Sequence, residues 1–312
     1  MKKRNNMGEA LVIKQLKKTY SSGVVALSGI DLTVPEGEFF GLLGPNGAGK
    51  TTIISIVTGL TNKTSGMVEI FGQDIDTDVS LAKSNVGVVP QEFNFSIFEK
   101  VIDIVVDQAG YYGIPRSVAS PRAEKYLKLL GLWEKRDEAA RMLSGGMKRR
   151  LMIVRALIHE PKLLILDEPT AGVDIELRRE MWDFLRVINA SGRTIILTTH
   201  YLEEAEQLCK RIAIINQGAI VKQGLVKELL GDMTTETFLF DLERSLSSEM
   251  EAELATISAR KVDADTIEMT LRKGEVLGDA ITSLGKLGIR VRSMRNKTNR
   301  LEELFLDVTK KV

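Results

Sequence analysis

The sequence predicts an α/β domain built on a largely parallel sheet, followed by a small α+β domain. Three observations lead to this prediction. A glycine-rich loop at residues 44–52 stands between a short apolar run and a stretch with helical spacing. Two later apolar runs, 163–166 and 194–199, are continuous, as expected of strands buried on both faces of a parallel sheet. After Thr234, strand-like and helical segments form a second, smaller unit.

The composition is that of a soluble protein with room for one large domain or for a medium domain and a small one. The chain has 312 residues, of which 44% are hydrophobic, so a substantial core can form. The formal net charge of +1 is too balanced to indicate nucleic acid or an anionic membrane as a partner. The single cysteine, Cys209, excludes an internal disulfide and fits a reducing compartment. Neither a signal peptide nor an apolar run long enough to span a bilayer is recognisable, so we expect a cytoplasmic protein.

The stretch at residues 44–52 reads as a phosphate-binding loop of the form G-x-x-x-x-G-K-[ST]. Its glycines let successive backbone N–H groups point at an anion, and the helix that follows adds the partial positive charge of its N-terminus. In such a loop Lys50 binds the β- and γ-phosphates and the Thr51 hydroxyl is a ligand of Mg²⁺. A glycine-rich turn without a ligand is the alternative, which the flanking strand and helix disfavour. The loop consists of Gly44, Pro45, Asn46, Gly47, Ala48, Gly49, Lys50, Thr51 and Thr52.

Short stretches on either side of this loop have the pattern of strands, namely 11–18, 30–34, 67–71 and 86–89. The first of them leads to Tyr20, upstream of the loop. An aromatic side chain at this place either stacks on the base of the nucleotide or ends a half-buried strand.

A helical insertion is expected after the last of these strands. Pro90-Gln91 breaks the strand pattern, and residues 92–138 read as mainly helical. We expect an apolar face there that is formed by Tyr126, Leu127, Leu129, Leu130 and Leu132.

A second glycine-rich stretch, Ser144-Gly145-Gly146, precedes a helical run over 148–159. Ser144 is a candidate N-cap, and bare N–H groups at a helix start can bind an anion. On this stretch alone, a capped helix without a ligand is the favoured interpretation. The basic residues 148–150 are interpreted as a solvated helix face.

Asp167 and Glu168 follow directly after the apolar run 163–166. The carboxyl end of a parallel strand is where open α/β sheets bind ligands. Two adjacent acids have separable tasks there, because the first can hold Mg²⁺ and the second can orient or deprotonate the water that attacks the γ-phosphate. The alternative is a pair of loop carboxylates without a ligand.

His200 stands at the end of the other buried run, 194–199. With no cysteine or second histidine nearby, a zinc site is not expected at His200. The more specific hypothesis is that His200 contacts the γ-phosphate. The other histidine, His159, is interpreted as a helix-end residue. Residues 212–221 predict a hairpin that turns at 216–219.

Taken in order, these motifs resemble those of ABC transporter ATPase subunits over residues 9 to 230. The amino-acid sequence of the second glycine-rich stretch is similar to that in ATPases of the drug, polysaccharide and haem exporter group. Residues 90–95 and 294–297 are similar to those of its YadG-like subunits. The corresponding Walker A, Q-loop, signature, Walker B, D-loop and H-loop motifs are 44–52, Gln91, 143–147, 163–168, Ala171-Gly172-Val173-Asp174 and His200, with Tyr20 as the aromatic A-loop.

The resemblance implies a head-to-tail homodimer with two ATP molecules between the protomers. Ser144, Gly145, Gly146 and Asp174 would then contact the nucleotide held by the partner. It also implies that Thr51, Gln91 and Asp167 serve Mg²⁺, that Glu168 is the general base, and that His200 fixes its geometry. Met147 departs from the glutamine of many relatives, so a side-chain hydrogen bond to the opposite nucleotide is lost while the backbone donors remain.

The resemblance also implies the domain organisation. Residues 1–9 are an N-terminal tail, and 10–232 form the ABC ATPase domain, a P-loop NTPase with a RecA-like core, an antiparallel β subdomain and a helical subdomain at about 92–145. Residues 234–312 form a small α+β domain, which we interpret as packing or dimer-stabilising, with regulation as the alternative. Its last helix has Asn299 and Glu302 as a candidate capping box.

Two functions from different classes fit these motifs. The first is a transport motor that drives a separate membrane permease and is peripheral on the inner face of the cell membrane. The second is a soluble mechano-enzyme acting on a ribosome or on DNA, which the balanced charge and the single cassette disfavour. In the first case Phe93, Phe95 and Phe98 are candidates for docking the permease, unless they belong to the core.

Overall fold

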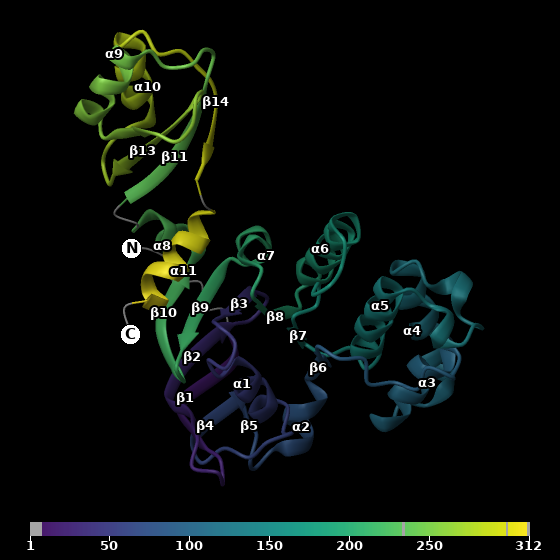
Figure 1. Ribbon diagram of the computed structural model, residues 1–312. Coiled ribbons are helices and arrows are strands. Elements are labelled where there is room, and N and C mark those ends of the chain that lie inside the picture. The colour runs from purple at the N-terminus through teal and green to yellow at the C-terminus, as the bar shows by residue number, and fades with distance from the viewer. Residues whose placement is uncertain (1–7, 233–234, 298, 311–312) are drawn as a thin grey trace, which may run out of the picture. The chain divides into compact units, whose positions relative to one another are not determined.

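The computed structural model describes residues 8–232, 235–297 and 299–310 (Figure 1). Of the predicted tail at 1–9, residues 1–7 therefore lie outside the described part. The chain divides into two compact units, Met1–Leu225 and Val226–Val312. The helix Val226–Gly231 thus belongs to the second unit, and the boundary expected at 232–234 falls after it.

The first unit contains an antiparallel sheet whose strand order is β2-β1-β4-β5. Alternating residues of its strands, such as Ile30, Leu32 and Val34, are buried in the main core, because side chains of a strand point in turn to opposite faces. The strands are β1 (Glu9–Thr19), β2 (Val25–Pro35), β4 (Ser65–Ile70) and β5 (Gln73–Asp74).

The second sheet of this unit has six strands in the order β10-β9-β3-β8-β7-β6. All neighbours are parallel except the β9–β10 pair. β3, β7 and β8 are buried along their whole length, which confirms the expected buried parallel strands. The strands are β3 (Phe39–Leu43), β6 (Val86–Val89), β7 (Leu163–Asp167), β8 (Thr194–Thr199), β9 (Arg211–Asn216) and β10 (Ala219–Leu225).

The predicted hairpin is confirmed at the turn between β9 and β10. Gln217 and Gly218 both have a positive φ, 47° and 74°, which is the backbone of a type I′ turn. A Cβ atom at Gly218 would also lie 2.7 Å from the carbonyl oxygen of Ala26, so only glycine fits this position without displacing β2.

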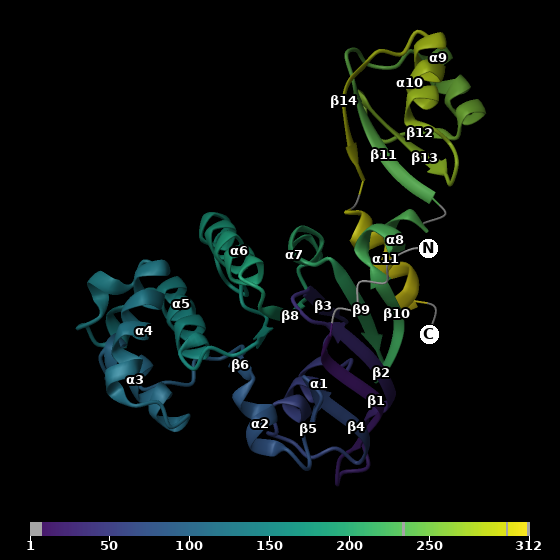
Figure 2. The same ribbon diagram turned by 180° about the vertical axis from the view of Figure 1, so that it is seen from behind.

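The helices of the first unit form two groups. Figures 1 and 2 draw α3, α4 and α5 together, apart from α1 and α2. Of the predicted helical run 92–138, residues 92–100 are not helical, and Leu129 is exposed rather than part of the apolar face, because it lies on the outer side of α4. The helices are α1 (Lys50–Val57), α2 (Val79–Ser84), α3 (Val101–Tyr111), α4 (Arg116–Leu129), α5 (Gly145–Leu157), α6 (Ile175–Ala190) and α7 (Leu202–Leu208), with 3₁₀ turns η1 (Trp133–Lys135) and η2 (Ala140–Met142).

The second unit is an antiparallel sheet, ordered β12-β13-β11-β14, with helices and its own core. Phe240, Ile267 and Leu284 are fully buried at its centre. Asn299 accepts hydrogen bonds from the backbone N–H groups of Leu301 (2.8 Å) and Glu302 (3.3 Å), as an N-cap does. The elements are α8 (Val226–Gly231), β11 (Thr235–Leu242), α9 (Ser248–Glu253), η3 (Leu254–Ile257), β12 (Ala259–Lys261), β13 (Thr266–Arg272), α10 (Leu277–Lys286), β14 (Val291–Asn296) and α11 (Arg300–Lys310).

Candidate functional site

The glycine-rich loop joins β3 to α1, and three of its glycines meet separate constraints. Gly47 and Gly49 have φ values of 78° and 114°, a region that costs other residues free energy. A Cβ atom at Gly44 would lie 2.4 Å from the carbonyl oxygen of Ile215. The loop can therefore keep this shape only with glycine at these positions, and its backbone leads directly into the N-terminus of α1.

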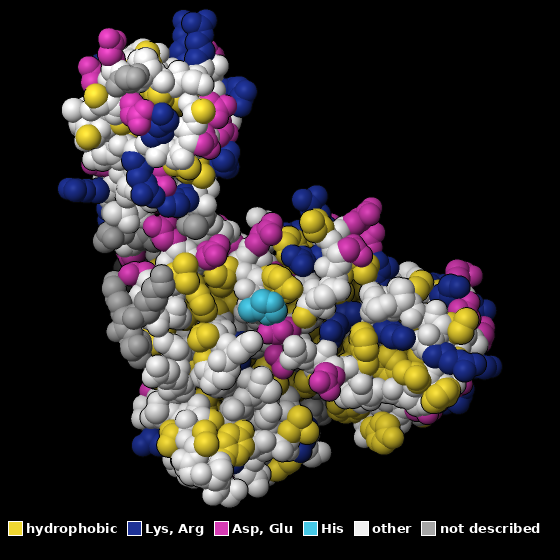
Figure 3. Space-filling view, viewed as in Figure 1, with side chains coloured by type: hydrophobic (Ala, Val, Ile, Leu, Met, Phe, Trp, Pro, Cys, Tyr) yellow, Lys and Arg dark blue, Asp and Glu magenta, His cyan; other side chains and the backbone are white. Residues whose placement is uncertain are grey.

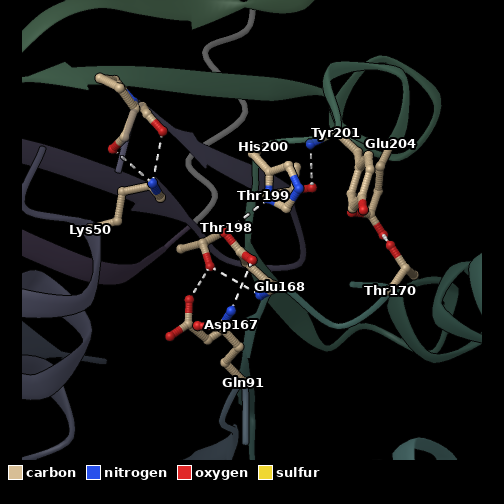
Figure 4. Close-up of polar contacts among 12 residues, drawn as sticks. Lys50, Gln91, Asp167, Glu168, Thr170, Thr198, Thr199, His200, Tyr201 and Glu204 are labelled. Atoms are coloured by element: carbon tan, nitrogen blue, oxygen red, sulfur yellow. Dashed lines mark hydrogen bonds and ion pairs between the residues drawn. The ribbon is translucent and has the colours of Figure 1, made fainter. Parts of the chain in front are cut away.

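Lys50 is the first residue of α1, and its side chain is buried. Its Nζ donates hydrogen bonds to the carbonyl oxygens of Gly44 (2.7 Å) and Pro45 (3.1 Å), so the ammonium group lies over the loop (Figure 4). Burial lowers the pKa of Lys50, while the negative charges of Glu168 and Asp167 raise it. The ammonium group of Lys50 is therefore close enough to both carboxylates for their charges to act on it.

Tyr20 lies beside the same loop. Its hydroxyl oxygen is 3.5 Å from the hydroxyl oxygen of Thr52, in the first turn of α1. The ammonium group of Lys18 lies 4.8 Å from the centre of the tyrosine ring. The ring remains partly exposed, so one face can receive an aromatic base.

The two adjacent acids stand at the end of β7, held by its neighbour β8. The carboxylate of Asp167 is buried and accepts a hydrogen bond from the Thr198 hydroxyl. The backbone N–H of Glu168 donates to the carbonyl oxygen of Thr198 (3.0 Å). Glu168 has a φ of 48°, and this uncommon backbone conformation turns its side chain away from the line of the strand.

Both carboxylate oxygens of Glu168 have a partner from another segment (Figure 4). Oε2 accepts a hydrogen bond of 3.2 Å from Nε2 of Gln91, which follows β6. Oε1 lies 3.0 Å from Nδ1 of His200, which follows β8. Because β6, β7 and β8 are parallel neighbours, their carboxyl ends bring Gln91, Glu168 and His200 together.

The residues expected to hold Mg²⁺ supply oxygen atoms of three kinds. Thr51 offers a hydroxyl, Asp167 a carboxylate and Gln91 an amide carbonyl. No group of three or more His, Cys, Asp and Glu side chains forms a metal site in the described part of the chain. A single carboxylate fits an ion that keeps water and substrate phosphates as its remaining ligands, as Mg²⁺ does.

The second glycine-rich stretch lies elsewhere in the first unit. Ser144 caps α5 by accepting a hydrogen bond from the N–H of Met147 (3.2 Å). A Cβ atom at Gly146 would lie 1.8 Å from Cδ2 of Leu177 in α6. Asp174 caps α6 by accepting from the N–H of Leu177 (2.9 Å).

The structure thus brings together some predicted site residues and separates others from them. Lys50, Gln91, Asp167, Glu168 and His200 meet at one edge of the parallel sheet. Ser144–Gly146 lie at the start of α5, which packs with α3 and α4 rather than with α1 (Figures 1 and 2).

Two residues near the site were not predicted from the sequence. Thr198 orients both acids, yet within a buried strand its hydroxyl gives no local signal. Arg149 is buried, donates to the carbonyl oxygen of Pro90 (3.0 Å) and lies 5.2 Å from the ring centre of Phe93. The expected solvated face at 148–150 is therefore wrong for Arg149, because that position of α5 points at the segment carrying Gln91.

Comparisons with known proteins identify the family of this chain. The ABC transporter family model matches residues 27–171. The Nod factor export ATP-binding protein I of Cupriavidus metallidurans is 36% identical over 97% of this chain and 98% of its own length. The linearmycin resistance ATP-binding protein LnrL of Bacillus subtilis is 34% identical over 96% of this chain and 98% of its own.

Solved structures give the same fold. A dimeric ATP-binding cassette in a post-hydrolysis state with ADP and phosphate is similar at a TM-score of 0.62, with 26% identity over 69% of this chain and 98% of that one. Among the described residues, no helix combines the length and the apolar character needed to cross a membrane. The chain belongs to the ABC transporter family as an ATP-binding subunit, and it is an ATPase.

Proposed function

We propose that two copies of this chain close head to tail around two ATP molecules and drive export through a separate membrane permease. The observation that carries this proposal is the carboxylate of Glu168, held by Gln91 and His200 beside a buried lysine and a phosphate-binding loop. Export is supported by two relatives, a Nod factor export protein and a linearmycin resistance protein.

In this proposal the residues of the site have separate roles, and Gln91 has two. Lys50 and the loop 44–52 hold the phosphates, and Tyr20 stacks on the base. Glu168 takes the proton from the water that attacks the γ-phosphate, so that ADP leaves and inorganic phosphate forms. Gln91 and His200 orient that carboxylate. Mg²⁺, held by Thr51, Asp167 and Gln91, would neutralise charge on the phosphates.

The separation of the two glycine-rich stretches supports the dimer. Ser144 and Gly145 are exposed and Gly146 is partly buried at the start of α5, and Asp174 caps the start of α6. In a head-to-tail pair the start of α5 faces the γ-phosphate that is bound to the partner subunit, and Asp174 lies beside that nucleotide. ATP thus joins the two protomers, and its hydrolysis releases them.

The permease would dock on an exposed apolar surface beside Gln91. Phe93 and Phe98 are 43% and 73% exposed, and Ile97 is also exposed. Figure 3 shows hydrophobic side chains gathered over the helical part of the first unit. A cytoplasmic helix of the permease fits such a surface, and this chain would then work at the inner face of the cell membrane.

The test is the substitution Glu168→Gln, which removes the base but keeps the shape and one hydrogen-bond acceptor. We expect ATP binding to remain, phosphate release to fall by at least about 100-fold, and an ATP-bound dimer to accumulate in size-exclusion chromatography. Glu203→Gln, at an exposed position of α7, is the matched control and should behave as wild type. Normal steady-state hydrolysis by Glu168→Gln would overturn the role of this base.

A further inference from the structure

A buried carboxyl group lies just behind the site, on α7. Glu204 is fully buried, and its Oε1 accepts hydrogen bonds from the Thr170 hydroxyl (3.0 Å) and from the Trp182 indole N–H (3.1 Å). Burial penalises its charged form and raises the pKa of Glu204. Burial of a carboxyl group costs free energy, which hydrogen bonds such as these two offset.

The first donor belongs to the segment that carries the catalytic base. Thr170 follows Glu168 by two residues in a tight turn. In that turn the N–H of Ala171 donates to the carbonyl oxygen of Glu168 (3.2 Å), and the N–H of Val173 donates to that of Thr170 (3.1 Å). Holding the Thr170 side chain therefore holds the turn in which Glu168 keeps its positive φ.

The acceptor belongs to the segment that carries His200. The backbone N–H of Glu204 donates to the carbonyl oxygen of Tyr201 (3.0 Å), and the N–H of Tyr201 donates to the Thr199 hydroxyl (2.9 Å). The ring of Tyr201 lies 4.1 Å from that of His200. Glu204 is thus fixed to the loop 199–201 through the first turn of α7, and Figure 4 shows its side chain bound to Thr170 and the N–H of Tyr201 bound to Thr199.

We propose that Glu204 is a positioning residue for ATP hydrolysis, which ties the turn after Glu168 to the loop that carries His200. This inference rests on the proposed function. The tie sets the 3.0 Å approach of His200 Nδ1 to Glu168 Oε1, and neither Thr170 nor Glu204 needs to touch the nucleotide. Small displacements of a base can cost far more in rate than in substrate affinity.

The experiment compares kcat and KM for ATP in the full chain. Thr170→Val removes only the hydroxyl at nearly constant volume, and Glu204→Ala removes the acceptor. We expect both to lower kcat about ten-fold and to leave KM within about two-fold, because neither change reaches the phosphate-binding loop. Glu204→Gln keeps an oxygen acceptor and resembles the neutral acid, so it should restore most of kcat.

The control is Glu203→Ala, which removes the neighbouring exposed carboxylate on the same helix. Thermal melting of each variant separates positioning from folding, and Thr170→Val remains informative if Glu204→Ala does not fold. Wild-type kcat in Thr170→Val overturns the proposal, as does a Glu204→Gln variant that is as slow as Glu204→Ala. If wild type itself does not hydrolyse ATP, the proposed function fails instead.

Discussion

The Nδ1 atom of His200 lies 3.0 Å from Oε1 of Glu168, and the two residues follow neighbouring parallel strands. The glutamate side chain is 11% exposed and the histidine side chain 47%. The imidazole therefore covers one side of a largely buried carboxylate, while Gln91 contacts its other oxygen. This arrangement leaves the carboxylate few orientations, which is the condition for efficient proton transfer by the base that we propose.

His200→Ala should lower kcat by at least about 100-fold, because it frees the carboxylate to rotate. The melting temperature should change little, since the imidazole is half exposed and its loss leaves no large cavity. Phosphate release and ATP binding are the measurements. Since the two residues act as a unit, His200→Ala combined with Glu168→Gln should be no slower than Glu168→Gln alone. Multiplying losses in the double variant would argue that the residues act independently.

Gly145→Asp tests whether the second glycine-rich stretch faces a phosphate of the partner subunit. A Cβ atom at Gly145 meets nothing within 4 Å, and an acid in the first turn of α5 is favourable to the helix dipole. The monomer should therefore fold normally, while hydrolysis drops about 100-fold because like charges repel across the dimer. Gly145→Asn, of equal size but neutral, is the matched control and should retain clearly more activity. Equal activity of the aspartate variant and wild type would contradict the head-to-tail arrangement.

The positions of the phosphate-binding loop and of the parallel strands could be predicted from the sequence because their causes are local. Gly49 has a φ of 114°, a backbone conformation that favours glycine. The run 163–166 is apolar because both faces of β7 are buried. The contacts of Glu168 have no such signal. They join residues 77 and 32 positions away through the order of the strands, which no short pattern encodes.

The buried side of a helix could be predicted less well from the sequence than the buried strands. Arg149 stands in a run of three basic residues that resembles a solvated face, yet its place on α5 turns it inward to the carbonyl group of Pro90. Leu129 shows the converse, since an apolar residue on α4 is left exposed. Glu204 could not be distinguished from its exposed neighbour Glu203, because its two donors come from other segments of the chain, Thr170 from the turn after β7 and Trp182 from α6. Composition alone does not decide which side of a helix is covered.

The environment of His159 leads us to expect that the free energy of unfolding depends on pH. His159 is partly buried, its ring stacks on Tyr112 at 3.7 Å, and its Nε2 is 3.0 Å from the carbonyl oxygen of Val86. Nε2 must therefore carry the hydrogen, and Nδ1 is buried without a hydrogen-bond partner among the described residues. Burial lowers the pKa of His159 below its ordinary value of 6.5, although the bond to Val86 opposes the shift.

The sign of the effect follows from proton counting. Below pH 6.5 the unfolded chain binds a proton at His159 before the folded chain does, so the free energy of unfolding falls as pH decreases through this window and levels off below the lowered pKa. His159→Gln should be less stable at neutral pH, because the stacked ring is lost, but its stability should depend less steeply on pH between about 7 and 5. Urea unfolding at several pH values measures this slope. Tyr112→Phe is the control, because it keeps a ring against the imidazole and should keep the wild-type dependence of stability on pH. An unchanged slope in His159→Gln would show that another group governs the pH dependence of stability in this range.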